Sequence, residues 1–131
     1  KKSQRYNIEI LEGVDYKNLL GLYGRARFFW SAAGYEVNEK IHPEQVEHFG
    51  ITTVEAMAAG AVPLVFGAGG QKEIIENGKT GFLWKREKEL ISLTKELIGD
   101  RNQMLNFSNN ARIVSKRYEY EKFENSVSEI L

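Results

Sequence analysis

The sequence contains no cysteine, which excludes disulfide bonds and thiolate metal sites. Proline occurs only twice, and no apolar run approaches the roughly 20 residues that a membrane-spanning helix needs. The opening residues do not have the pattern of a secretory signal peptide. Since a chain without cysteine also suits a reducing compartment, we expect a soluble, cytoplasmic protein.

The sequence also lacks a net charge, because lysine plus arginine and aspartate plus glutamate number 18 each. A chain without an overall field has no general attraction for nucleic acid or for an acidic membrane, so neither is expected as a partner. Its 131 residues have the size of one domain. Methionine occurs only at Met57 and Met104, and the first residue is Lys1, so we expect a fragment of a longer protein.

Apolar patterns predict strands that alternate with helices. Alternating or continuous apolar residues predict strands at 7–11, 27–31, 62–66 and 80–84. Asp15 is expected to cap a helix that ends at Gly24, and helices are also predicted from Gly50, at 71–76 and, as three apolar stripes, within 87–131. Because each connection contains a helix, the predicted class is α/β, a parallel sheet with helices on both faces.

The whole chain, 1–131, is expected to form a single domain with helices at its C-terminal end, 87–131. Residues 32–46 are polar, have no period and are longer than most strand-to-helix connections, so they are interpreted as an insertion. At the carboxyl end of a buried strand, this insertion would lie beside a ligand crevice. A flap over a ligand and a surface elaboration without a role in chemistry are both compatible with its composition.

The stretch 47–60 predicts a turn that enters a short helix rich in small residues. Gly50 allows the backbone to approach a ligand closely. The N–H groups of Phe49, Gly50, Ile51 and Thr52 are expected to point outward at the positive end of the helix dipole, where anions such as phosphate bind. This stretch therefore predicts an anion site with acids on either side, Glu47 and Glu55.

Other familiar sites do not fit the sequence. The run from Gly67 to Gly70 lacks the third glycine of a dinucleotide fingerprint, and residues 77–80 resemble a P-loop end without its first glycine or its following helix. His42, Glu44, Glu47 and His48 lie on an irregular stretch without a recognised ligand spacing, so no metal and no other cofactor is expected.

Several sequence motifs in a set order resemble those of a known family. Glu47 and Glu55 bracket seven residues as in the E-x7-E signature, and three further blocks follow at 56–63, 69–74 and 76–83. With the preceding strand and helix, the likeness covers most of 8–83. The chain resembles the donor-binding, C-terminal half of the retaining glycosyltransferases of the GT-B architecture, often called glycosyltransferase family 4 or group 1.

The resemblance implies a Rossmann-like sheet whose first two strands are missing from this chain. Without those central strands, 7–11 and 27–31 would not be neighbours. The first strand could pair directly with the second, the missing strands could come from elsewhere, or part of the sheet could stay open. The segment that carries the arginine and lysine for the donor diphosphate in similar enzymes also has no match here.

The resemblance also implies roles for the two acids. Glu55 would accept hydrogen bonds from the ribose hydroxyls, for which a carboxylate offers two acceptor oxygens. The alternative for Glu55 is a capping box with Thr52, in which it only closes the helix start. Glu47 is the candidate catalytic residue, placed at the donor sugar, where it would stabilise charge that develops at the anomeric carbon. The alternative for Glu47 is an exposed loop acid.

Further substrate-binding residues follow from the same resemblance. The backbone N–H groups of residues 49–52 would face the sugar and the diphosphate, and Gly13 with Val14 would seat the base. His48 would contact sugar or phosphate, or be a partly solvated histidine. The block of Gly69, Gly70 and Glu73 is interpreted as a tight strand-to-helix turn with an acid that favours the helix start.

The resemblance thus implies a retaining hexosyltransferase whose donor is a nucleotide-diphosphate sugar. The sequence of residues 47–51 is most like that of enzymes that use GDP-mannose, and a UDP-sugar is the other donor considered. The acceptor would be held by an N-terminal domain of the same protein that is absent here, so the fragment is expected to be inactive alone and to meet a membrane only through a lipid acceptor. Two alternatives stay open: a non-catalytic nucleotide-sugar-binding module, and an unrelated phosphate-binding domain with its ligand at 67–70.

Overall fold

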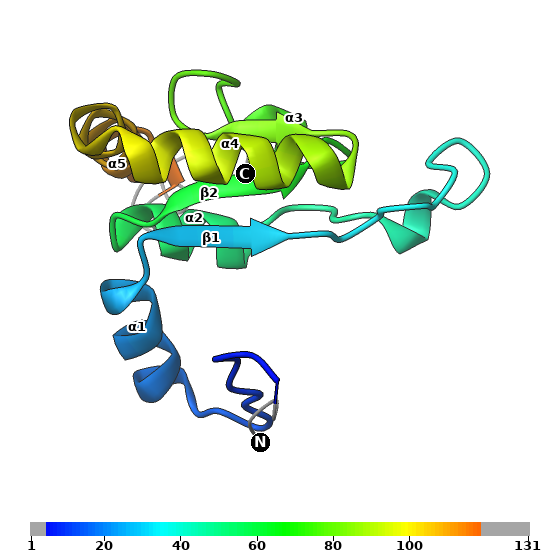
Figure 1. The fold of residues 1–131 in the computed structure, drawn as a ribbon. Helices are drawn as coiled ribbons and strands as arrows, with labels where there is room; N and C mark the ends of the chain where they lie inside the picture. The colour runs from blue at the N-terminus through cyan, green and yellow to red at the C-terminus, as the bar shows by residue number, and fades with distance from the viewer. Residues whose placement is uncertain (1–4, 119–131) are drawn as a thin grey trace, which may run out of the picture.

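The structure is a computed structural model that describes residues 5–118, so the apolar stripe predicted within 120–131 lies outside it. The chain order of the elements is α1 (Tyr16–Arg25), β1 (Phe28–Ser31), the 3-10 turn η1 (Pro43–Gln45), α2 (Ile51–Ala58), β2 (Val62–Phe66), α3 (Gln71–Ile74), β3 (Phe82–Trp84), α4 (Glu87–Gly99), α5 (Arg101–Ser115) and the 3-10 turn η2 (Lys116–Tyr118). Figure 1 shows their arrangement.

The three strands form one parallel sheet in the order β1-β2-β3. The register places Trp30 opposite Leu64 and Leu64 opposite Phe82. β2 is the central strand, and its residues 62–65 are all buried. A continuous apolar run suits this position because helices cover both faces of a parallel sheet. The strands predicted at 27–31, 62–66 and 80–84 are therefore confirmed, with observed bounds of 28–31, 62–66 and 82–84.

Alternate side chains of β2 enter two different cores. Val65 belongs to a cluster with Met57 of α2 and with Ala111 and Val114 of α5. Leu64, on the opposite face, packs in a cluster that includes Trp84, Leu97 of α4 and Phe107 of α5. The predicted α/β class with helices on both faces is confirmed, and Figure 1 shows α4 and α2 on opposite sides of β2.

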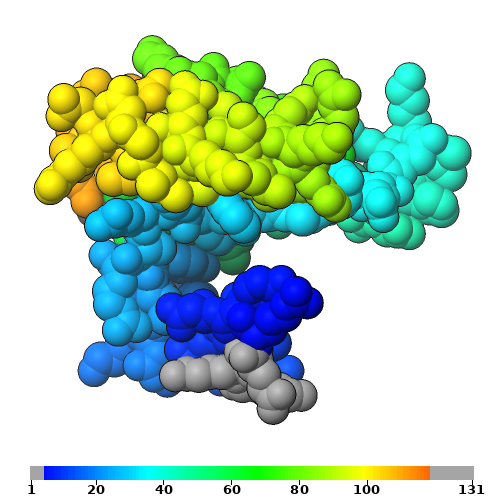
Figure 2. Space-filling view, in the orientation of Figure 1, coloured from blue at the N-terminus to red at the C-terminus, as the bar shows by residue number. Residues whose placement is uncertain are grey.

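The strand predicted at 7–11 is wrong, since only Glu9 within it forms a bridge and the sheet of the described residues begins with β1. Ile8 and Ile10 expose 53% and 47% of their surfaces instead of packing on a sheet face. α1 leads the segment away from the free edge of β1, and Figure 2 shows open space between it and the sheet in this view. Within the described residues, the edge of β1 that faces away from β2 has no strand beside it.

The insertion 32–46 is packed at both of its ends. Tyr35 contacts the rings of Phe66 and Trp84, with centroids 5.5 and 5.3 Å away. Val46 is buried, and an added Cβ at Gly34 would lie 2.9 Å from its Cγ1. Between these ends the segment projects from the body of the molecule (Figure 1). Tyr35 thus fastens one end to the sheet and Val46 packs against Gly34, whereas residues 40–45 are all exposed.

Candidate functional site

The N-terminus of α2 is shaped by Gly50. This residue is the helix N-cap and adopts the left-handed conformation, with φ 78° and ψ 39°, which favours glycine. A Cβ there would lie 2.7 Å from Ile74 Cδ1 and 3.2 Å from Gln71 Oε1 of α3. Gly50 is therefore needed both for the turn and for the close approach of α3.

The Glu47 carboxylate occupies part of the predicted anion site. Its Oε1 accepts the N–H groups of Phe49 at 3.3 Å and of Gly50 at 3.0 Å. The prediction that both amides are free is therefore wrong for this structure, because a carboxylate of the same turn lies where an external anion would bind. Ile51 and Thr52 are the first two residues of α2, so their N–H groups have no hydrogen-bond partner within the helix. Both residues are exposed.

The loop after β2 is locked onto the backbone that carries Glu47. Gly70 donates its N–H to the Glu47 carbonyl at 2.7 Å. A Cβ at Gly69 would collide with the Glu47 carbonyl oxygen, and one at Gly70 with that of His48. The paired glycines thus let two backbone segments touch, which places the His48 side chain on the exposed surface beside the turn.

The insertion contributes a contact that the sequence did not indicate. Glu39 Oε1 accepts the Gly69 N–H at 2.9 Å, and Glu39 Oε2 lies 3.2 Å from Lys72 Nζ. The backbone hydrogen bond from Gly69 and the Lys72 ammonium hold the pKa of Glu39 below its ordinary value. The insertion therefore contacts the loop after β2, and that loop in turn is hydrogen-bonded to the backbone of Glu47.

Glu55 meets α1 instead of the start of its own helix. The Tyr16 hydroxyl donates to Glu55 Oε1 at 3.0 Å. This hydrogen bond, followed by the charge of Glu55, raises the pKa of Tyr16 above its ordinary value. The N-cap of α2 is Gly50 and has no side-chain hydrogen bond, so the capping box of Thr52 and Glu55 is not formed. Glu55 is thus not occupied in closing α2.

Gly13 and Val14 lie in the loop before α1, not at the end of a strand, because the predicted first strand is absent from the sheet. Gly13 has φ 62° and is exposed. The two residues precede Tyr16, whose hydroxyl reaches Glu55. The base contact implied for Gly13 and Val14 stays a prediction.

Three buried polar atoms beside the site have no hydrogen-bond partner in the described part of the chain. They are Thr53 Oγ1 and both amide atoms of Gln71. Thr53 lies in α2 and is fully buried, whereas Gln71 is 1% exposed and faces Gly50. Sequence reasoning missed them because polar residues at helix starts are usually solvated.

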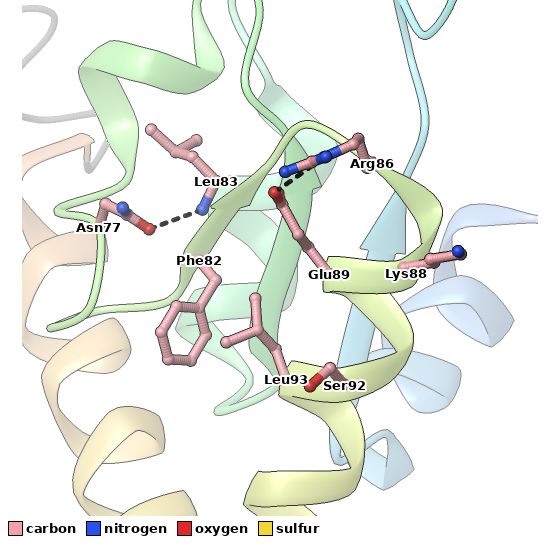
Figure 3. Close-up of a pocket in the computed structure, with 8 residues that line it drawn as sticks. All are labelled: Asn77, Phe82, Leu83, Arg86, Lys88, Glu89, Ser92 and Leu93. Carbon is pink, nitrogen blue, oxygen red and sulfur yellow. Dashed lines mark hydrogen bonds and ion pairs between the residues drawn. The ribbon is translucent and has the colours of Figure 1, made fainter.

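A surface pocket of about 660 Å³ lies elsewhere, between β3 and α4. Figure 3 shows its lining, which includes none of the predicted site residues. Two pairs of its polar groups are already in contact: Asn77 Oδ1 accepts the Leu83 N–H at 2.9 Å, and Arg86 Nε lies 3.5 Å from Glu89 Oε1. Residues 5–118 also hold no group of three or more side chains arranged for a metal, and no helix long and apolar enough to cross a membrane.

Comparisons with known proteins agree on one family. Residues 1–114 match the family described as "Glycosyl transferases group 1". A GDP-Man:Man(3)GlcNAc(2)-PP-Dol alpha-1,2-mannosyltransferase of Dictyostelium discoideum is 34% identical over 91 residues, which are 69% of this chain and 18% of that protein. A sucrose synthase of Denitrovibrio acetiphilus is 29% identical over 136 residues, covering 89% of this chain and 17% of that protein.

Solved structures of HepE from Anabaena are similar in fold. The complex with UDP has a TM-score of 0.68 and 26% identity over 83% of this chain and 28% of HepE. The complex with UDP-glucose has a TM-score of 0.60 and 31% identity over 64% of this chain and 24% of HepE. The chain thus spans less than a third of each of these relatives. Its α/β fold matches the GT-B glycosyltransferases, and the chain belongs to the group 1 glycosyl transferases.

Proposed function

We propose that this chain is the donor-binding part of a retaining glycosyltransferase whose donor is a nucleotide-diphosphate sugar. The observation that carries the proposal is the start of α2, where Ile51 and Thr52 are exposed and Glu47 bonds the amides just before them, in a chain of this family. Helix N-termini bind phosphate through free N–H groups and the helix dipole. Glu55, not needed as a cap, offers acceptor oxygens to ribose hydroxyls.

In this proposal the donor competes with Glu47 for the turn. The Glu47 carboxylate holds the amides of Phe49 and Gly50, which a diphosphate or sugar oxygen would also use. When the nucleotide sugar accepts hydrogen bonds from these two amides, the Glu47 carboxylate is free to turn toward the sugar. The bond from the anomeric carbon to the diphosphate then breaks, an acceptor oxygen bonds to the same face of that carbon, and the acceptor proton leaves with the diphosphate. Glu47 stabilises the positive charge of the transition state.

The donor is GDP-mannose or a UDP-sugar. The mannosyltransferase relative is named for GDP-Man, whereas the HepE structures contain UDP or UDP-glucose. We propose that the acceptor binds a further domain of a longer protein, so that the isolated chain transfers nothing. A panel of GDP- and UDP-sugars, tested on the full-length protein with NMR assignment of the product anomer, decides the donor and the stereochemistry. An inverted product contradicts the retaining assignment.

The role of Glu47 has its own test. Glu47→Gln keeps the shape of the side chain but removes its charge, so we expect turnover to fall by about two orders of magnitude or more, the scale for loss of a charge-stabilising group. Donor affinity should fall far less. Wild-type turnover in this variant would remove Glu47 from the mechanism. Glu44→Gln, on the exposed part of the insertion, is the matched control.

One observation favours a second candidate, a nucleotide-sugar-binding module without transferase activity. The hydrogen bonds of Glu47 to its own turn also give that carboxylate a purely structural role. This candidate predicts donor binding without turnover in the full-length protein for every acceptor offered. It further predicts that Glu47→Gln lowers the melting temperature but leaves donor binding as it is.

A further inference from the structure

Tyr16 joins α1 to the acid on α2. It is the first residue of α1, and the N-cap Asp15 fixes the start of that helix through an Oδ1 that accepts the Asn18 N–H at 2.9 Å. Its hydroxyl donates to Glu55 Oε1 at 3.0 Å across 39 residues of sequence. The ring itself is 61% exposed. Tyr16 thus makes a directed polar contact without being part of the core.

α1 is a firm support for this contact. Tyr23 on the same helix is 7% exposed and packs in a cluster with Ala56 and Ala61. Its ring also meets Phe29 of β1 edge-on, at a centroid distance of 6.1 Å. Because Ala56 directly follows Glu55, the helix that carries Tyr16 is packed against the same turn of α2 as the acid. The phenol therefore has a defined position relative to the carboxylate.

The hydrogen bond leaves Glu55 able to bind a ligand. An ionised carboxylate has about four acceptor positions, and the phenol uses one of them. A phenol is protonated at neutral pH even with its ordinary pKa, and the hydrogen bond to Glu55 raises the pKa of Tyr16 further, so the hydroxyl stays a donor. A half-buried glutamate without such a partner would sample several rotamers, and a ligand would have to order it on binding.

We infer that Tyr16 is a positioning residue: its phenol holds the Glu55 carboxylate in place for the vicinal diol of a ribose and so strengthens the preference for ribonucleotides over 2′-deoxyribonucleotides. The inference rests on the proposed function, in which Glu55 binds the ribose. A 2′-deoxynucleotide lacks one of the two hydroxyls, so it gains less from a carboxylate that is held in the correct orientation.

The test measures the affinity of the full-length protein for UDP and GDP by calorimetry, and then compares the tighter nucleotide with its 2′-deoxy form. Tyr16→Phe removes only the hydroxyl. We expect it to weaken binding of the ribonucleotide by about threefold to tenfold, the scale for ordering one side chain. Binding of the deoxynucleotide should stay nearly unchanged, so the ratio between the two affinities should fall.

Tyr6→Phe is the matched control, because Tyr6 is also 61% exposed and its ring contacts Arg5 at 5.5 Å. That variant should keep the wild-type ratio. In the background of Glu55→Gln, Tyr16→Phe should change the ratio no further, since the two residues act as a unit. An effect of Tyr16→Phe that persists in this background would overturn the inference.

The remaining outcomes separate this inference from the proposed function. An unchanged ratio in Tyr16→Phe, with tight nucleotide binding by the wild type, overturns the role of Tyr16 and leaves the proposed function intact. Equal weakening of both nucleotides also overturns it, because the phenol would then act on another part of the ligand. If the wild-type protein binds neither nucleotide nor any nucleotide sugar, the proposed function itself fails.

Discussion

At the scale of single residues, Gln71 is the side chain whose environment suits it least. Both atoms of its amide are buried without a partner among residues 5–118. A buried polar group that lacks hydrogen bonds costs about 1–3 kcal/mol. Its place against Gly50 puts this cost next to the start of α2.

Replacement of this amide should therefore stabilise the protein. Gln71→Met keeps an unbranched side chain of similar length, so we expect the free energy of unfolding to rise by about 1 kcal/mol. Urea denaturation followed by circular dichroism measures the change. Gln45→Met, at an exposed position, is the control and should have little effect. A less stable Gln71→Met protein would mean that ordered water satisfies the amide.

At the scale of elements, the insertion 32–46 and the loop after β2 behave as one unit. Glu39 bridges them through the Gly69 amide and Lys72, and Gly70 continues the contact to the Glu47 carbonyl. The sequence analysis did not predict this contact of Glu39. The composition of a polar loop does not show which of its acids contacts the loop after β2.

The link should depend on pH in one direction. The pKa of Glu39 is lowered from 4.5 in the folded state, so its stabilisation is fully present above 4.5 and is lost as the pH falls through the lower, folded value. We expect Glu39→Gln to lower the melting temperature near neutral pH, and the gap to the wild type to close in acid. Exchange of the Gly69 amide, followed by NMR, should be faster in the variant.

Glu44→Gln serves as the control for this experiment, because Glu44 belongs to the same insertion but does not reach the loop after β2. A gap between the wild type and Glu39→Gln that stays constant from neutral to acidic pH would contradict the assigned link. The direction matters here, since a group with a raised pKa would produce the opposite dependence.

At the scale of the whole molecule, the open edge of β1 is the most unusual feature. β1 pairs only with β2 within the described residues, and Trp30 on this strand is 53% exposed. Ile8 and Leu11 of the preceding segment are about half exposed as well. Unpaired edges with apolar side chains promote association between chains.

The 131-residue chain should therefore self-associate by itself, and Trp30→Lys should reduce this tendency. A lysine on an edge strand disfavours pairing with another chain. Light scattering coupled to gel filtration, over a range of concentrations, measures the effect. Ile98→Lys, an exposed apolar position on α4, is the control. A wild-type chain that stays monomeric at high concentration would contradict the expected association through β1.

The sequence by itself determined the α/β class, three of the strands, the Asp15 cap of α1 and the turn at Gly50. These features depend on local periodicity and on residues with restricted backbone preferences. Both can be recognised in a single sequence. The same holds for the family, since its motifs are short segments in a set order. The strand predicted at 7–11 is wrong because the alternation of apolar residues alone does not show whether a segment joins the sheet.

Only the tertiary structure decided which groups meet at the site. Tyr16 reaches Glu55 across 39 residues, and Glu39 reaches Gly69 across 30. The tertiary structure also decided that the Glu47 carboxylate accepts hydrogen bonds from its own turn and that Glu55 does not cap α2. Such contacts depend on how the sheet brings distant loops to one place, and that arrangement results from packing of the whole chain, which no local pattern encodes.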